Sequence, residues 1–118
     1  MPSQNHAILT LPLLLTEDVR ANTFVDLTGG TAEPGGYAYG VATFNATLQG
    51  VPGVRDTVSV HVLGTAQVVA GGAVEVGEAV QVGSGGKAVP HASGEKVGRA
   101  LQAANADGDL IEVLLIPS

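Results

Sequence analysis

Short runs of alternating apolar and polar residues, separated by glycine-rich turns, follow one another along most of the chain. In the clearest run, Thr57–Leu63, alternate valines occupy one side of a strand of period two. Gly pairs and Asp107–Gly108 supply the turns between such runs. The pattern predicts an all-β fold, with further strands at Thr23–Leu27, Tyr37–Phe44, Ala66–Ala70, Ala79–Val82, Lys87–Val89, Lys96–Leu101 and Leu110–Ile116. Ala and Gln favour helix, so one helical turn is expected at Gln102–Ala106.

The most apolar segment, Ala7–Leu15, lies near the start of the chain. It is too short to span a bilayer and contains Pro12. No basic residue precedes it, and Thr16–Asp18 follows it, so it lacks the pattern of a signal peptide. We therefore expect residues 1–18 to form an N-terminal arm of the mature chain. Two interpretations stay open: a strand buried in its own domain, or an arm that packs on another subunit.

A weak internal repeat relates the two halves of the chain. The matching segments are Val19–Leu27 with Val74–Val82, Tyr39–Ala42 with Val97–Ala100, and Asp56–Val60 with Asp109–Val113. The matches predict a diverged duplication, with repeats at about residues 19–63 and 74–116 of a single β domain that spans residues 19–118. Asn45–Arg55 is longer than its counterpart, which is typical of a surface loop.

Composition narrows the possible partners and sites. A chain of 118 residues fits one domain, and the absence of cysteine excludes disulfides and thiolate metal sites. The formal net charge of −6 opposes attraction to phosphate backbones, so nucleic acid is not expected as a partner.

Residues that suggest chemistry lack the spacing that the chemistry requires. His6, His61 and His91 are far apart in sequence and show no metal-ligand pattern. Gly85-Gly86-Lys87 lacks the hydroxyl residue of a phosphate-binding loop. Lys87 beside a turn suggests a lipoyl or biotin carrier, but its neighbours do not match such carriers. The sequence therefore predicts no enzyme, no catalytic residue, no metal and no cofactor.

The segment Val68–Leu115 resembles the C-terminal half of a family of small bacteriophage head-decoration proteins, also called capsid cement proteins. The residues that carry the resemblance are Ala70-Gly71, Val74, Gly77, Gly85-Gly86, Gly98-Arg99-Ala100 and Gly108–Val113. Gly40–Ala42 and Thr57–Val60 extend it weakly to the first half.

This resemblance implies a compact β-barrel or β-tulip-like domain that is made in the host bacterial cytoplasm and sits on the outer surface of the capsid. It implies that the chain stabilises contacts between major capsid subunits, and that its partners are the major capsid protein and its own copies, as a homotrimer or another small homo-oligomer. Neither nucleic acid nor a membrane is an expected partner. The alternatives are another structural virion or β-clip-like interaction module, such as a tail or spike component, and a carrier domain.

The apolar N-terminal segment and the long loop are the parts in which we expect the capsid or subunit interface. The candidate residues are Ile8, Leu9, Leu11, Leu13, Leu14, Leu15, Leu48, Val51 and Val54.

Overall fold

The computed structural model describes residues 6–43, 45–47 and 56–115, which form strands joined by short turns. The elements are β1 (His6–Leu14), β2 (Phe24–Val25), β3 (Gly40–Ala42), β4 (Thr57–Val69), β5 (Ala79–Val82), the 3-10 turn η1 (Ser84–Gly86), β6 (Ala88–Pro90), β7 (Gly98–Ala100) and β8 (Leu110–Leu115). The predicted all-β fold is confirmed. No helix in this part of the chain has the length and apolar character needed to cross a membrane.

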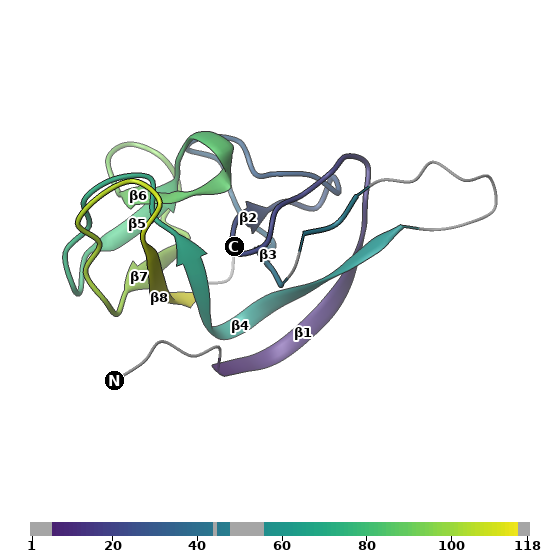
Figure 1. The fold of residues 1–118 in the computed structure, drawn as a ribbon, viewed down its shortest axis with the longest axis horizontal. Coiled ribbons are helices and arrows are strands. Elements are labelled where there is room, and N and C mark those ends of the chain that lie inside the picture. The colour runs from purple at the N-terminus through teal and green to yellow at the C-terminus, as the bar shows by residue number, and fades with distance from the viewer. Residues whose placement is uncertain (1–5, 44, 48–55, 116–118) are drawn as a thin grey trace.

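The strands form one antiparallel sheet that is organised around β4. Its order is β2-β3-β4-β8-β7-β5-β6, and β1 pairs with β4 outside this path. Figure 1 shows β4 as a long curved strand with β1 running beside it, while β5–β8 gather at one end. There Ala88 of β6 forms a parallel bridge with Ala70, and Gly71 N–H donates to the Ala88 carbonyl at 2.8 Å. The sheet therefore curls back on the end of β4.

The chain from Thr57 to Val69 is one strand, not the two that the sequence pattern predicts. β1 pairs with β4 as far as Thr65, and β8 pairs with it from Thr65 onward. Gly64, where φ is +95°, lies at this change of partner and adopts a conformation that other residues rarely reach. The predicted break at Gly64 is wrong because backbone pairing continues through it.

The predicted helical turn at Gln102–Ala106 is also wrong. Ala104 instead forms an antiparallel bridge with Val74, in which each N–H donates to the other carbonyl at 2.9–3.0 Å. The Asp109 carboxylate accepts the N–H groups of Asn105 and Ala106. These contacts satisfy the backbone in an extended form, and they outweigh the helix propensity of the alanine and glutamine residues in this short segment.

Two units of this fold pair their strands in the same register. The first unit contains β1, β2, β3 and residues 57–61 of β4, and the second contains residues 65–69 of β4 with β5, β7 and β8. Equivalent residue pairs are Leu13–Val58 and Val68–Ile111, Phe24–Val41 and Ala79–Arg99, Val41–His61 and Arg99–Leu114, and Val19–Ala46 and Val74–Ala104. The second unit also includes β6, which extends its sheet.

Backbone geometry repeats as well. Asn22, with φ +62°, is the one positive-φ position among the described residues other than glycine, and Gly77, with φ +84°, stands at the equivalent place. Asn22 N–H donates to the Ala42 carbonyl at 2.9 Å, and Gly77 N–H donates to the equivalent Ala100 carbonyl at 2.7 Å. The structural correspondence includes Thr10 and Thr65, so it begins before the sequence match at Val19 and Val74. That the units arose by duplication stays a prediction.

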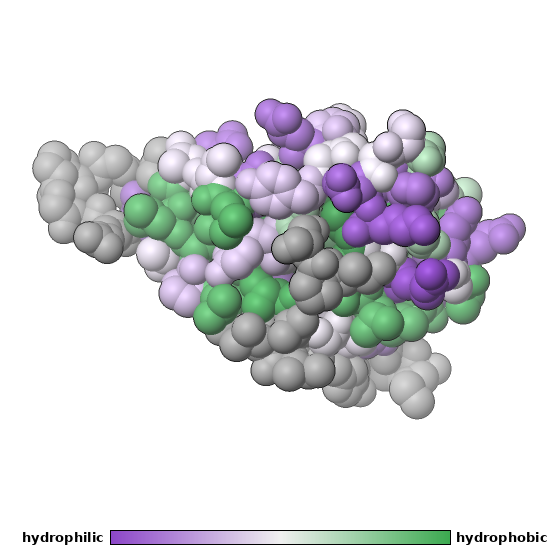
Figure 2. Space-filling model, turned by 180° about the vertical axis from the view of Figure 1, so that it is seen from behind, coloured by the Kyte–Doolittle hydropathy of each residue, from purple (hydrophilic) through white to green (hydrophobic). Residues whose placement is uncertain are grey.

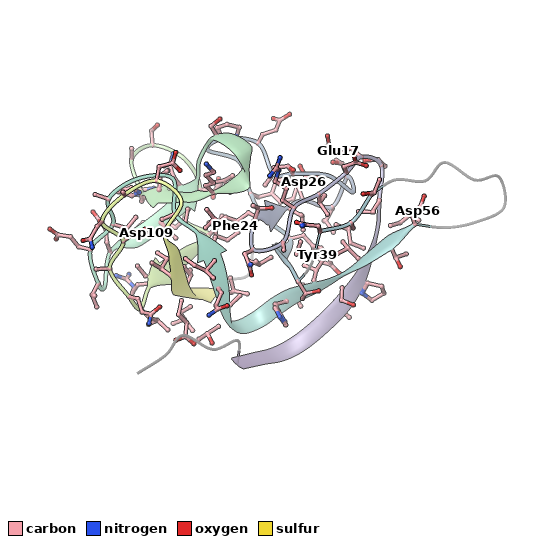
Figure 3. The ribbon with its side chains drawn as sticks, in the orientation of Figure 1. Glu17, Phe24, Asp26, Tyr39, Asp56 and Asp109 are labelled. Carbon is pink, nitrogen blue, oxygen red and sulfur yellow. The ribbon has the colours of Figure 1, made fainter. Side chains whose placement is uncertain are left out.

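Each unit has its own buried cluster, and the second cluster is larger. Eight apolar residues form the cluster of the first unit: Leu13, Leu15, Val19, Val25, Ala42, Ala46, Val58 and Val60. Their equivalents all belong to the cluster of the second unit: Val68, Ala70, Val74, Val80, Ala100, Ala104, Ile111 and Val113. Phe24 and Val41 of the first unit also belong to that second cluster, and Figure 3 places Phe24 toward β4 and the second unit. The second unit therefore covers part of the first unit's sheet.

Gly40 and Gly98 are equivalent positions at which the strands approach too closely for a side chain. A Cβ at Gly40 would collide with the His61 carbonyl oxygen, and one at Gly98 would lie 2.8 Å from that of Leu114. We expect Gly40→Ala and Gly98→Ala each to lower the free energy of unfolding by about 2 kcal/mol, the usual scale of overpacking. Urea denaturation followed by circular dichroism measures this.

Gly72→Ala is the matched control, because a Cβ at Gly72 would meet no atom within 4 Å. Its effect is expected to stay within about 0.5 kcal/mol. If all three variants unfold at the same urea concentration as the original chain, the close approach at Gly40 and Gly98 does not constrain the fold.

Candidate functional site

The predicted interface segment lies on the ribbon formed by β1 and β4. Leu13 pairs with Val58 and Leu14 with Thr57, so adjacent leucines point to opposite sides of the ribbon. Leu13 and Leu15 are buried in the cluster of the first unit, whereas Leu14 is 52% exposed. Leu14 is therefore available for a partner, and Leu13 and Leu15 hold the strand to its own domain.

For the other predicted interface residues, the structure gives the strand position of some and does not describe the rest. Leu11 is half-buried in β1 and pairs with Val60. Ile8 and Leu9 belong to β1 at a point where the pairing register with β4 shifts. Leu48, Val51 and Val54 lie outside the described residues. Of the predicted residues whose side chains the structure describes, Leu14 is the exposed one on the ribbon.

The outer edge of β1 is a second feature of this ribbon. Within the described part of the chain, β1 pairs with β4 and with no other strand. The backbone groups of an edge strand are a template for pairing with another chain. Pro12 interrupts the row of donors along this edge, because proline has no backbone N–H. Proline is tolerated on an edge strand where its nitrogen faces away from the neighbouring strand. Strand addition is therefore restricted to the residues on either side of Pro12.

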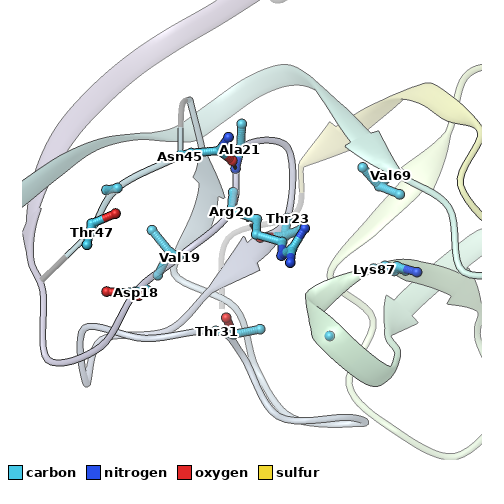
Figure 4. A pocket seen from close by; sticks show the side chains of 12 residues that line it. Asp18, Val19, Arg20, Ala21, Thr23, Thr31, Asn45, Thr47, Val69 and Lys87 are labelled. Atoms are coloured by element: carbon cyan, nitrogen blue, oxygen red, sulfur yellow. Dashed lines mark hydrogen bonds between the residues drawn. The ribbon is translucent and has the colours of Figure 1, made fainter.

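A hollow of about 770 Å³ lies where the two units meet. Figure 4 shows Arg20, Asn45 and other first-unit residues on one side of it, and Val69 and Lys87 on the other. Lys87 forms an ion pair with Asp107 at 2.9 Å. Lys87 is thus engaged within the chain, which differs from the free lysine at a hairpin tip that a carrier domain would present.

An equivalent hollow of about 500 Å³ lies in the second unit, and its charge differs. Val74 and Ala104 line it at the positions that Val19 and Ala46 occupy in the first hollow. Glu75 stands where the first hollow has Arg20. Among the described residues, every buried side-chain N or O atom has a hydrogen-bond partner.

A family model described as phage cement protein matches residues 3–115 of this sequence, which is almost all of it. The chain belongs to the phage cement protein family. The resemblance read from Val68–Leu115 is thus confirmed, and it extends to β1 and the first unit.

Comparison with solved structures finds a similar fold in a bacteriophage protein. The matching chain comes from the crystal structure of the head fiber gp8.5 N base in bacteriophage phi29. The match has a TM-score of 0.70 and 22% sequence identity, and it covers 92% of this chain and 93% of that one. At this identity the match shows the fold. The comparison with curated proteins found no match.

The histidine and acidic residues that could suggest a metal or catalytic site lie apart from one another or form hydrogen bonds with the backbone. In the described part of the chain, no group of three or more His, Asp or Glu side chains is placed to hold a metal ion. The His91 ring lies 2.8 Å from the Gly94 carbonyl oxygen, and the Asp109 carboxylate accepts the Asn105 N–H at 2.8 Å. Burial lowers the pKa of His61, which lies on β4.

Sequence reasoning missed an exposed apolar set in the second unit. Leu110 and Leu114 of β8 and the nearby Leu101 are 42–44% exposed. Figure 2 shows apolar surface gathered in separate patches on one side of the molecule. The signal was present in the sequence, because Leu110–Leu115 carries leucines on both faces of the strand, whereas its equivalent Thr57–Val62 alternates polar and apolar residues.

Burial of Leu13 and exposure of its neighbour Leu14 predict very different effects of the same substitution. We expect Leu13→Ala to cost about 2–5 kcal/mol of unfolding free energy, because it leaves a cavity in the first cluster. Leu14→Ala is the matched control and is expected to cost less than about 0.5 kcal/mol. Thermal or urea unfolding measures both, and equal losses would mean that β1 does not pack as described.

The lowered pKa of His61 predicts a pH dependence of stability. The unfolded chain binds a proton at His61 near the ordinary pKa of 6.5, and the folded chain binds it only at lower pH. The contribution of His61 to the free energy of unfolding is therefore fully present above about pH 6.5 and decreases as the pH falls below this value. We expect the original chain to lose more unfolding free energy between about pH 7.5 and 5.5 than His61→Gln. Identical losses in the two proteins would contradict the prediction.

Proposed function

We propose that this chain binds the outside of an assembled phage head and stabilises contacts between major capsid subunits. The family match over residues 3–115 carries the proposal, because it includes both units and the β1 strand. The similar fold of the phi29 protein, which is the N base of a head fiber, supports a place on the head. The partner is the major capsid protein, and the chain occupies the outer surface of the virion.

The β1–β4 ribbon supplies a physical means of attachment. Backbone groups on the outer edge of β1 can pair with a strand of the capsid protein, which gives affinity with few demands on side-chain identity. Leu14 adds an exposed apolar contact beside that edge. Ile8, Leu9 and Leu11 belong to the same strand, and Leu48, Val51 and Val54 complete the proposed interface.

Burial of Leu13 and Leu15 anchors the proposed attachment strand in the core of its own domain. A strand that is anchored in the core of its own domain transmits load to the whole domain, whereas a loose arm does not. Many copies placed on a regular lattice then multiply individually weak contacts. The chain has no disulfide, so its resistance to strain depends on packing and on these contacts.

Purified chain mixed with undecorated heads tests the proposal. We expect saturable binding and a rise in the melting temperature of the heads, because a ligand that binds the assembled state stabilises it. Sedimentation of heads with bound chain and differential scanning calorimetry measure the two effects. If neither binding nor a rise in melting temperature is found, the chain is not a cement protein of these heads. If electron microscopy of phage with labelled chain shows the label at the tail, the chain is a tail or spike component instead.

Leu14→Asp identifies the surface used. It places a charge on the proposed contact without removing a buried group, and at least a tenfold loss of head affinity is expected (about 1.4 kcal/mol). Leu27→Asp is the matched control, since Leu27 is 63% exposed and lies outside the ribbon. Equal affinities for the two variants would place the contact elsewhere on the chain.

A further inference from the structure

The turn at Asp107 and Gly108, which leads into β8, is the one place in the sequence where an aspartate precedes a glycine. The other four aspartates are followed by Val, Leu, Thr or Leu, and no asparagine precedes a glycine. Glycine has no Cβ and a permissive backbone, so its nitrogen can approach the side chain of the preceding residue closely. The Asp107 side chain is 63% exposed, so water reaches it. These features are typical of a site at which aspartate converts spontaneously to isoaspartate.

This conversion needs water and no other reagent. The main-chain nitrogen of Gly108 attacks the carboxyl carbon Cγ of Asp107 in its protonated form. A C–N bond forms, a C–O bond breaks, and the N–H proton leaves with the hydroxyl group as water, which gives a cyclic imide. Water then opens the imide at either carbonyl carbon. Opening at the main-chain carbonyl carbon gives isoaspartate, which has the same mass as aspartate but a backbone that is longer by a methylene group.

In the folded chain, both reacting groups are engaged by other partners. Lys87, which lies between η1 and β6, donates from Nζ to Asp107 Oδ1 at 2.9 Å. Gly108 N–H donates to the Ala70 carbonyl oxygen at 2.8 Å. In Figure 4 the Lys87 side chain extends away from Arg20 and the other first-unit residues. The imide can form only when Gly108 N–H leaves Ala70 and the carboxylate turns away from Lys87.

The same turn holds the end of β4 in place. Ala70 follows β4 directly and is fully buried, and its N–H donates to the Asp109 carbonyl oxygen at 2.7 Å. Gly108 and Asp109 thus exchange two backbone hydrogen bonds with this one residue. An added methylene group between Asp107 and Gly108 would displace both partners of Ala70. Modification of Asp107 is therefore expected to loosen the start of β8 and the end of β4 together.

We propose that Asp107 is a modification site that stays unreacted in the folded chain, and that Lys87 protects it. The ion pair then has a chemical role besides its small contribution to stability, which is usual for exposed pairs. The chain belongs to the phage cement protein family, and a protein of an assembled particle is not replaced by new synthesis. A slow reaction in it would accumulate, so protection of the one reactive turn preserves the fold. Binding to heads is not required for this role.

Purified chain incubated for several weeks at neutral pH tests the proposal. Liquid chromatography and mass spectrometry of the peptide that contains Asp107 measure the isoaspartate formed, and hydroxylamine, which cleaves the imide, confirms the intermediate. We expect the chain unfolded in guanidinium chloride to react at least about tenfold faster than the folded chain, because folding limits the opening of the turn. The separated isoaspartate form should unfold at a lower guanidinium concentration than the original chain.

Variants of the lysine separate its role from that of the fold. In folded Lys87→Gln the rate should rise about two- to fivefold, the scale expected for loss of an exposed ion pair. Lys96→Gln is the matched control, since it removes the same charge from an exposed position outside the ion pair. Lys87→Arg should restore protection, because a guanidinium group can also pair with the carboxylate. Circular dichroism checks that each variant is folded.

Three results would overturn the proposal. The first is a folded original chain that reacts at Asp107 as fast as the unfolded chain. The second is a Lys87→Gln variant that reacts no faster than Lys96→Gln. If Lys87→Gln does not fold, the original chain in about 1 M NaCl replaces it, since salt screens exposed pairs, and an unchanged rate excludes the role of Lys87. The third is an isoaspartate form as stable as the original chain, because the turn would then not hold the end of β4.

Discussion

The pairing of β4 with different partners along its length is the constraint on which the rest of this structure depends. Its first half pairs with β1 and β3, and its second half pairs with β8. Val58 and Val60 enter the first buried cluster, whereas Ala66 and Val68 enter the second. One continuous strand therefore supplies hydrogen bonds and core residues to both units, and neither unit is complete without it. Gly64 at the change of partner lets the backbone serve both sides.

Joining two similar units through one strand makes their surfaces unequal. Phe24 and Val41 are covered by the second unit, while the equivalent Ala79 and Arg99 are not. The equivalent hollows differ as well, since one contains Arg20 and the other Glu75. Positions that are buried in both units are apolar, and positions that face outward differ between the units. We therefore expect the binding residues of the chain among the outward-facing positions that differ between the units.

This division matches the demands on a phage cement protein. Without disulfides, a domain of this size depends on a closely packed interior, which the two clusters supply. Attachment then requires surfaces that the interior does not use. The outer edge of β1 is one such surface, because its backbone groups are not paired with another described strand.

The amino-acid sequence by itself determined the class of fold, the turns and the weak repeat, because alternation and glycine positions act locally. Ala79–Val82 was predicted with its observed bounds for this reason. Tertiary structure decided the rest. It made one strand of Thr57–Val69 and replaced a helical turn with the Val74–Ala104 bridge, since both depend on partners distant in sequence.

The same limit applies to the candidate site. An apolar segment at Ala7–Leu15 was evident from the sequence, but only the pairing of β1 with β4 separated buried Leu13 and Leu15 from exposed Leu14. A shift of one residue in that register would have exchanged the two sides. Likewise, Leu110–Leu115 revealed a strand with leucines on both faces, and its packing in the fold decided that Leu110 and Leu114 stay exposed. Local residue patterns specify strands, whereas burial depends on which strands meet.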